Sequence, residues 1–152
     1  MQTTRQLSVT LINKPGRLAS LLAALSKGKA GFRALSVMDT GERGTLRFVP
    51  DNLSAAVEVL DRASVSYDMT EVLLVEVPAQ PGGFRNICER LAADHLNIDY
   101  AYCSFDPFQG VRGGVSAVIK VNDLAKAQRT LGLNGSSTRR RQRPGRRPVH
   151  AR

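Results

Sequence analysis

One pattern occurs twice in this sequence and constrains the fold more than any other feature. An alternating apolar run, Leu7 to Leu11, leads into the turn Pro15-Gly16, and leucines then recur at the spacing of one helix face. Adding 66 to these numbers gives the same pattern around Pro81-Gly82. Beyond the second strand of each copy the offset grows to 71, and the five extra residues fall around Asp106 to Gly110. A hairpin tip tolerates such an insertion at little cost, so two copies of one unit account for residues 5 to 131.

Each copy is expected to fold as strand, helix, strand, strand, helix, strand. In the first copy the strands are predicted at 5–11, 32–38, 45–49 and 65–70, with helices at 17–27 and after Pro50-Asp51-Asn52. The stretch 65–77 is too long for one strand, so we assign 72–77 to the start of the second copy. Two helices on one face of a four-stranded antiparallel sheet make a ferredoxin-like unit. The predicted fold class is therefore α+β, with two such βαββαβ units in tandem.

The second copy stops short of its last strand. By the offset of 71 this strand should begin near Ser136, but the sequence there is Gly135-Ser136-Ser137-Thr138 followed by arginines. We therefore expect the second sheet to lack a strand and the strand at 72–77 to have an open edge. Another chain would cover that edge, or the body would be less stable for it. The predicted domains are residues 1–70, residues 71–133 and a basic disordered tail at 134–152.

The net charge of +9 suggests nucleic-acid binding, but the position of the charge argues against it. Seven of the 22 basic residues are arginines in the last 14 positions. Residues 1–138 contain the other 15 basic residues and all 13 acidic ones, so the body carries a net charge of only +2. Such a tail touches polyanions without sequence preference. We predict no specific nucleic-acid partner.

Membranes, metals and common catalytic motifs are not indicated either. No apolar run approaches the roughly 18 residues that a membrane span needs, and no secretory signal precedes the first strand. Cys88 and Cys103 lack the spacing of a metal site and are expected to be reduced thiols in a cytoplasmic protein. The sequence contains no GxGxxG, P-loop or GxSxG motif. We therefore expect no enzyme activity, no cofactor and no metal.

The repeated strand, turn and helix resemble the ACT domain, a small ligand-binding module of amino-acid-metabolic enzymes and regulators. The resemblance is carried by Asn13-Lys14-Pro15-Gly16-Arg17-Leu18, by its echo at Pro81-Gly82, and by the strand start Asn97-Ile98. It covers roughly residues 5 to 131 and implies two ACT-like units without a catalytic domain beside them. It further implies that an amino acid or a similar small molecule binds between two units, in a homodimer.

The resemblance also implies site residues. In ligand-binding ACT domains the turn after the first strand supplies an Asn and backbone amides, and a polar residue at the second strand of the facing unit completes the pocket. The turn Asn matches Asn13 but Ala79 in the second copy, and the strand Asn matches Asn97 but Gly31 in the first. We expect one pocket that can bind the ligand, lined by both Asn13 and Asn97. The candidate ligand-binding residues are Asn13, Lys14, Pro15, Gly16, Arg17, Leu18, Asn97 and Ile98, with the second-copy turn Gln80, Pro81, Gly82, Gly83 and Phe84.

The chemistry of these residues suits a zwitterion but does not require one. Unpaired N–H groups at a helix start attract a carboxylate, and an Asn amide offers both donors and an acceptor. Asn before Pro-Gly is also an ordinary turn residue or cap. The predicted function is a non-catalytic regulatory protein that binds an amino acid, and the alternative is an interaction or dimerisation module without a ligand. Tyr100, Tyr102 and Phe105 either pack on a sheet face or line a pocket for an aromatic ligand.

Overall fold

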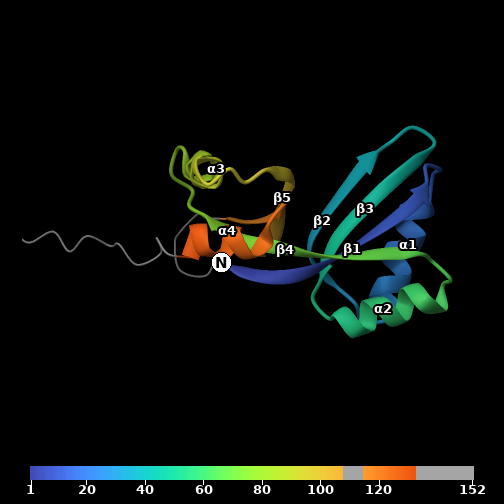
Figure 1. Cartoon of the computed structure of the whole chain (residues 1–152). Coiled ribbons are helices and arrows are strands. Elements are labelled where there is room, and N and C mark those ends of the chain that lie inside the picture. The colour runs from blue at the N-terminus through green and yellow to red at the C-terminus, as the bar shows by residue number, and fades with distance from the viewer. Residues whose placement is uncertain (108–114, 133–152) are drawn as a thin grey trace, which may run out of the picture.

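The structure, a computed structural model, describes residues 1–107 and 115–132. Its strands form one closed sheet in the order β1-β3-β2-β5-β6-β4, and every pairing is antiparallel (Figure 1). The α+β class is therefore confirmed, although the sheet is continuous, while the predicted tail at 134–152 lies outside the described residues. The elements are β1 (Gln2–Ile12), α1 (Arg17–Lys27), β2 (Phe32–Asp39), β3 (Arg43–Pro50), α2 (Leu53–Arg62), β4 (Tyr67–Val77), α3 (Gly83–Ala93), β5 (Ile98–Pro107), β6 (Val115–Val121) and α4 (Leu124–Gly132).

The strand β4 connects the two halves of the protein. We call β1, α1, β2, β3 and α2 the first half, and α3, β5, β6 and α4 the second half. Instead of two successive strands, the chain from Tyr67 to Val77 forms a single strand of 11 residues. It pairs with β1 from Tyr67 to Leu74 and with β6 from Leu73 to Val77. The predicted domain boundary between residues 70 and 71 falls inside this shared strand.

The N-terminal end of β1 takes the place of the strand that the second copy lacks. Gln2, Thr3 and Thr4 pair with Leu74, Leu73 and Val72 of β4, and Figure 1 shows the two strands side by side between the helix pairs. The prediction of an open edge is therefore wrong over residues 72–74, because the chain's own first residues cover it. The alternating pattern predicts this strand only from Arg5 onward, since the polar residues before it show no apolar alternation.

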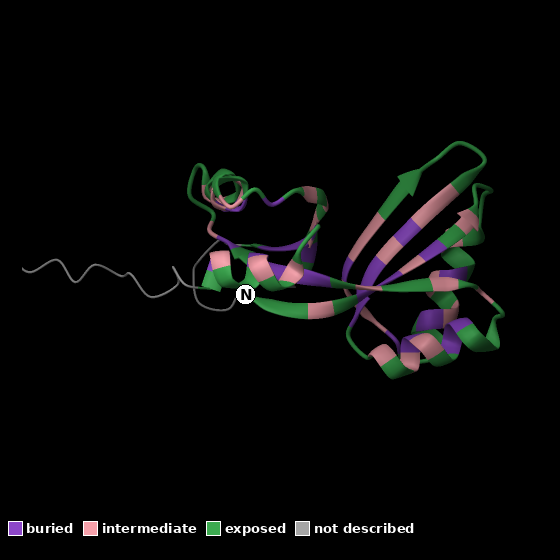
Figure 2. Ribbon diagram, in the orientation of Figure 1, coloured by how far each residue is buried: buried purple, intermediate pink, exposed green. Residues whose placement is uncertain are grey.

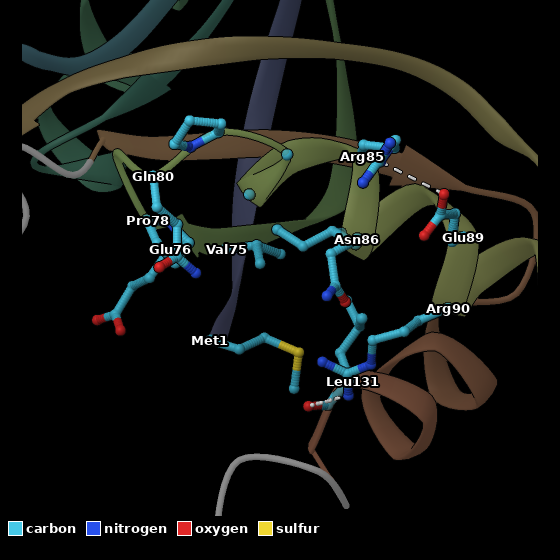
Figure 3. A pocket seen from close by; sticks show the side chains of 14 residues that line it. Met1, Val75, Glu76, Pro78, Gln80, Arg85, Asn86, Glu89, Arg90 and Leu131 are labelled. Carbon is cyan, nitrogen blue, oxygen red and sulfur yellow. Dashed lines mark hydrogen bonds and ion pairs between the residues drawn. The ribbon is translucent and has the colours of Figure 1, made fainter. Parts of the chain in front are cut away.

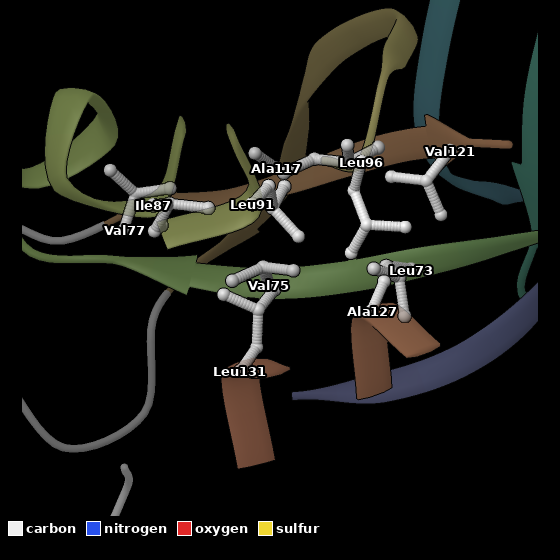
Figure 4. Packing of buried hydrophobic residues seen from close by; sticks show 11 residues of the cluster. Leu73, Val75, Val77, Ile87, Leu91, Leu96, Ala117, Val121, Ala127 and Leu131 are labelled. Atoms are coloured by element: carbon white, nitrogen blue, oxygen red, sulfur yellow. The ribbon is translucent and has the colours of Figure 1, made fainter. Parts of the chain in front are cut away.

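Each half packs two helices against its own part of the sheet. The two helix pairs lie in separate groups, and buried residues line the helix faces toward the strands (Figures 1 and 2). In the second half, side chains from α3, α4, β4 and β6 interleave (Figure 4). The repeat predicted equivalent core positions, and four such pairs are buried in both copies: Leu21 and Ile87, Leu25 and Leu91, Ala56 and Ala127, Leu60 and Leu131.

The two halves meet inside the closed sheet. Ala34, Val49, Val72, Leu74 and Val118 form a third buried cluster there, with Tyr102 packed against it. Among the described residues, β2 pairs with β5 at a single position, Ala34 with Ser104. The backbone pairing between β2 and β5 that closes the sheet is therefore short, and side-chain contacts must strengthen it.

A buried amide supplies such contacts. The Gln6 side chain is fully buried; its Nε2 donates to the Tyr100 hydroxyl at 2.6 Å, and the Tyr102 hydroxyl donates to its Oε1 at 2.8 Å. The Arg47 guanidinium lies 4.2 Å from the centre of the Tyr100 ring. Burial, and then the neighbouring Tyr100, raises the pKa of Tyr102 well above its ordinary 10.0. These two tyrosines therefore join the halves of the sheet, whereas Phe105 is 66% exposed.

Candidate functional site

The first turn holds Asn13 in contacts within its own half. The Asn13 Nδ2 donates to Asp39 Oδ1 at 3.3 Å and to the Gly41 carbonyl at 3.2 Å, and its backbone N–H donates to the Glu42 carbonyl. The amide thus fastens the end of β1 to the hairpin between β2 and β3. Gly16, with a φ of 84°, is the N-cap of α1, and no side chain caps the helix. Asn13 serves as a turn residue here, while the first N–H groups of α1 have no side-chain acceptor.

The cavity at this turn is small. We call it the α1 cavity; its volume is about 130 Å³, below the roughly 300–1,000 Å³ of ligand pockets. Of the predicted site residues, it includes Asn13, Lys14, Arg17 and Leu18. Its other walls are mainly apolar. An amino acid would fit poorly in this space within a single chain.

Asn97 also makes local contacts. Its Nδ2 donates to Asp99 Oδ1 at 2.9 Å, and its backbone N–H donates to Asn122 Oδ1 at 3.0 Å. The next residue, Ile98, pairs with Val121 at the end of β6. These bonds join the strand start to the turn that precedes α4. Asn97, like Asn13, satisfies its amide within its own half.

The structure does not bring Asn13 and Asn97 together within one chain. Through the pairings of β5, β6 and β4, Ile98 lies at the level of Glu71, which pairs with Arg5. Asn13 follows Arg5 by eight positions along β1 and the turn. At the rise of a β-strand, these eight steps place Asn13 about 27 Å from Arg5. The α1 cavity includes no residue of the second half. A pocket that contains both amides would need a second chain.

The second turn is built on two glycines. Gly82 has a φ of 82° and is the N-cap of α3, and again no side chain caps the helix. A Cβ on Gly83 would lie closer than 3.0 Å to the carbonyl oxygen of Pro78, a distance that real structures essentially never show. The Gly83 N–H donates to the Gln80 carbonyl at 3.1 Å. The turn therefore packs its backbone tightly and leaves the start of α3 uncovered by side chains.

A larger cavity lies beside this turn. We call it the α3 cavity; its volume is about 420 Å³, within the range of small-molecule sites. Of the candidate residues in the second-copy turn, Gln80, Pro81, Gly82 and Gly83 line it, whereas Phe84 does not. The other lining residues come from the first residue of the chain, the end of β4, the body of α3 and the end of α4 (Figure 3). Residues far apart in the sequence thus enclose one space.

Three side chains that sequence reasoning missed point toward one another across this cavity. They are Asn86, Arg90 and Met1 (Figure 3). One guanidinium nitrogen of Arg90 donates to the carbonyls of Thr130 and Leu131 at 2.8 and 3.1 Å, which fixes α4 against α3. The Arg90 Nε is buried without a hydrogen-bond partner among the described residues. The helical pattern predicted the inward face of α3, but the contribution of Met1 follows only from the pairing of β1.

The cavity combines charge with apolar surface. Arg90 and the uncapped start of α3 provide positive potential for a carboxylate. The Asn86 amide can donate to a carboxylate and accept from an ammonium group. Val75, Ile87 and Leu131 add apolar wall. The ion pair of Arg85 with Glu89 at 3.5 Å is exposed and adds little.

We expect Gly83→Ala to destabilise the protein by about 1–3 kcal/mol, because the new methyl group would force the Pro78 carbonyl to move. Urea unfolding followed by circular dichroism measures this loss. The control is Gly44→Ala, whose Cβ would lie 3.5 Å from the Met38 carbonyl, an ordinary contact. Equal midpoints for the two variants would contradict the close packing of the second turn.

Other kinds of site were also sought in the described residues. Within 1–107 and 115–132, no three His, Cys, Asp or Glu side chains are placed to hold a metal ion. Cys88 and Cys103 are free thiols. None of the helices in these ranges has the length and apolar character that crossing a membrane requires.

Comparison with known proteins identifies the family. The model of the ACT domain pair matches residues 2–131. Protein BT0572 from Bacteroides thetaiotaomicron has a similar structure, with 25% identity, a TM-score of 0.78, and coverage of 86% of this chain and 88% of that one. The regulatory subunit of aspartate kinase from Thermus thermophilus, in its ligand-free form, is 14% identical with a TM-score of 0.58, over 88% and 97% of the chains. Aspartokinase alpha and beta subunits give 16% identity and a TM-score of 0.52, over 88% and 96%.

The two aspartate kinase structures share only 14% and 16% of their residues with this chain, so their similarity supports the fold alone. A search of curated proteins found no match. The family match, however, extends from the start of β1 to the end of α4 and includes the segment that completes the second half of the sheet. The chain therefore belongs to the family of ACT domain pairs.

Proposed function

We propose that this chain is a non-catalytic regulatory module that binds an amino acid in the α3 cavity. The observation that carries the proposal is a space of about 420 Å³ beside an uncapped helix start, with Asn86 and Arg90 directed into it. Membership of the ACT domain pairs supports the regulatory role. The name of one structurally similar protein, a regulatory subunit of aspartate kinase, agrees with this role.

The cavity favours an amino acid with an apolar side chain. Its carboxylate would lie between the Arg90 guanidinium and the start of α3, where charge-assisted hydrogen bonds are strongest. The ammonium group would donate to the Asn86 Oδ1, and the side chain would contact Met1, Val75 and Leu131. In this arrangement each polar group of the zwitterion has a partner, and the apolar part is shielded from water.

The site expected at Asn13 and Asn97 remains a proposal for a dimer. Asn13 to Leu18 of one chain would face Asn97 and Ile98 of another, because one chain keeps them apart. Each half, together with the shared strand β4, would then be one ferredoxin-like unit, and the N-terminal end of β1 would complete the second unit. Such a site would add a second ligand position, distinct from the α3 cavity.

The alternative function, a dimerisation module without a ligand, is supported by the edge of β2. Among the described residues, β2 pairs with β5 only at Ala34, so its C-terminal part has one free edge. Val37 and Met38 on this part are 52% and 45% exposed. A second copy pairing along this edge would cover both side chains.

A thermal-shift screen with each of the twenty amino acids, followed by titration calorimetry, tests the proposal. A ligand present at 100 times its dissociation constant should stabilise the fold by about 2.7 kcal/mol. Asn86→Ala should weaken binding about tenfold or more, since it removes hydrogen bonds to charged groups. Asn13→Ala, at an amide outside the α3 cavity, is the matched control and should leave the affinity unchanged.

The other outcomes are equally informative. Loss of binding in Asn13→Ala with normal binding in Asn86→Ala would move the ligand to the first turn. The absence of a shift with every amino acid would favour the dimerisation module, which sedimentation of the full chain would then show.

A further inference from the structure

A third cavity lies where β1 extends past β4. The last pair between these strands is Val9 with Tyr67, whereas Thr10, Leu11 and Ile12 pair with β3 alone. The chain that enters β4 turns away there through residues 64–66, and Ser64 has a φ of 53°. The resulting space, which we call the notch cavity, has a volume of about 440 Å³. It is comparable in size to the α3 cavity.

The notch cavity occupies in the first half the place that the α3 cavity has in the second. Each lies between the end of one strand, the start of the helix that follows it, and a neighbouring strand. These elements are β4, α3 and β1 around the α3 cavity, and β1, α1 and β4 around the notch cavity. In the second half that neighbour begins at Met1, which contributes an apolar side chain, as Val75, Ile87 and Leu131 also do. The notch cavity instead has hydroxyl and charged groups on most of its wall. The two spaces are therefore suited to different ligands.

Two arginines from different elements line the notch cavity. Arg17 is the first residue of α1, and Arg43 is the first residue of β3. Neither guanidinium has an ion-pair or hydrogen-bond partner among the described residues. Both are consequently available to a carboxylate, and a guanidinium binds a carboxylate through two parallel hydrogen bonds.

One carboxylate lines the same space. Asp68 of β4 contributes to the wall and, like the two arginines, has no partner in the part of the chain that the structure describes. The nearby Asp61 faces another group: burial, and then this carboxylate, raises the pKa of the Tyr67 hydroxyl above 10.0. The hydroxyls of Ser8, Ser64 and Ser66 add groups that can donate or accept. The free side-chain charges of the cavity sum to +1.

We propose that the notch cavity binds an amino dicarboxylate, that is, an acidic amino acid. One carboxylate pairs with Arg17 and the other with Arg43, while the ammonium group pairs with Asp68. The ligand carries a net charge of −1 and the free charges of the cavity +1, so every charge receives an opposite partner. This inference does not depend on a ligand in the α3 cavity, because the α3 and notch cavities share no lining residue; Leu11, Ile12 and Arg17 also line the α1 cavity.

Titration calorimetry of the full chain with L-glutamate, L-aspartate, glutarate and succinate tests this site. The amino dicarboxylate of matching length should bind best. Arg17→Gln and Arg43→Gln should each weaken its binding about tenfold or more, since each removes a charge-assisted pair. Asp68→Asn should weaken the amino acid to a similar degree but leave glutarate or succinate as strong as before or stronger. A merely structural role of Asp68 would not produce that difference between ligands.

Two controls separate the outcomes. Arg129→Gln removes an exposed arginine from α4 and should not change the affinity, and Asn86→Ala alters only the α3 cavity. Circular dichroism confirms that each variant is folded. Equal weakening by Arg17→Gln and Arg129→Gln would show unspecific charge attraction and overturn the proposal. No binding of any of the four probes, or loss of binding in Asn86→Ala, would overturn it as well.

Discussion

Deletion of residues 2–5 is expected to destabilise the protein by about 4 kcal/mol, at roughly 1 kcal/mol for each of four lost backbone pairings. These residues pair with Leu74 to Glu71 of β4 and complete the sheet of the second half. Without them β4 has an unpaired edge beside Leu74, whose side chain is 4% exposed in the intact protein. A loss of this size is a large fraction of the total stability of a small domain.

Urea unfolding and hydrogen exchange of the β6 amides measure the effect. The control keeps the strand and replaces the exposed side chains of Gln2 and Arg5 with threonine. This variant should stay within about 0.5 kcal/mol of the parent protein, because surface substitutions away from special features change stability little. If the deletion and the substitution unfolded at the same urea concentration, the first residues would not complete the sheet.

Gln6→Leu is expected to destabilise the fold by about 2–4 kcal/mol, since the hydroxyls of the partly buried Tyr100 and Tyr102 lose their hydrogen-bond partner. The leucine keeps the approximate size of the side chain, so the loss reports hydrogen bonding more than packing. Further replacement of Tyr100 and Tyr102 by phenylalanine should recover part of this loss, because removal of both partners is cheaper than removal of one. Chemical denaturation of the single and combined variants measures the coupling. Strictly additive losses would contradict a shared network.

The same network has a pH dependence of known sign. Burial raises the pKa of Tyr102 above 10.0, so the folded state holds this proton more tightly than the unfolded state does. The stability that results is complete below pH 10 and is lost as the pH rises further. The free energy of unfolding should therefore fall less between pH 9 and pH 11 in Tyr102→Phe than in the parent protein. Urea unfolding at the two pH values measures this difference.

Periodicity predicted much of the fold. The repeat identified equivalent buried positions in both copies, such as Leu25 and Leu91, because helix faces that meet a sheet must be apolar. It missed the start of β1, since Gln2, Thr3 and Thr4 join the sheet through backbone pairing and their side chains are mostly exposed. It also divided β4 in two, because the side chains from Tyr67 to Glu71 are largely exposed whereas those from Val72 to Val75 are buried on both faces of the strand.

The residues of the candidate site could be predicted from the sequence less well than the fold. The sequence predicted turns at Pro15-Gly16 and Pro81-Gly82, and both glycines are in the left-handed region, which glycine adopts without a Cβ penalty. The amides of Asn13 and Asn97 have partners in Asp39 and Asp99 that no local pattern indicates. The α3 cavity depends on Met1 and on the end of α4, which approach α3 only in the folded chain.

The most direct test of the account is to map the bound amino acid on the protein. In an NMR titration with the amino acid that stabilises the fold most, the account predicts shifts in the amides of Gly82, Gly83, Asn86 and Leu131. The amides of Asn13 and Asn97 should remain unchanged at one ligand per chain. Shifts concentrated at Asn13 and Asn97, with the start of α3 unaffected, would contradict a ligand in the α3 cavity.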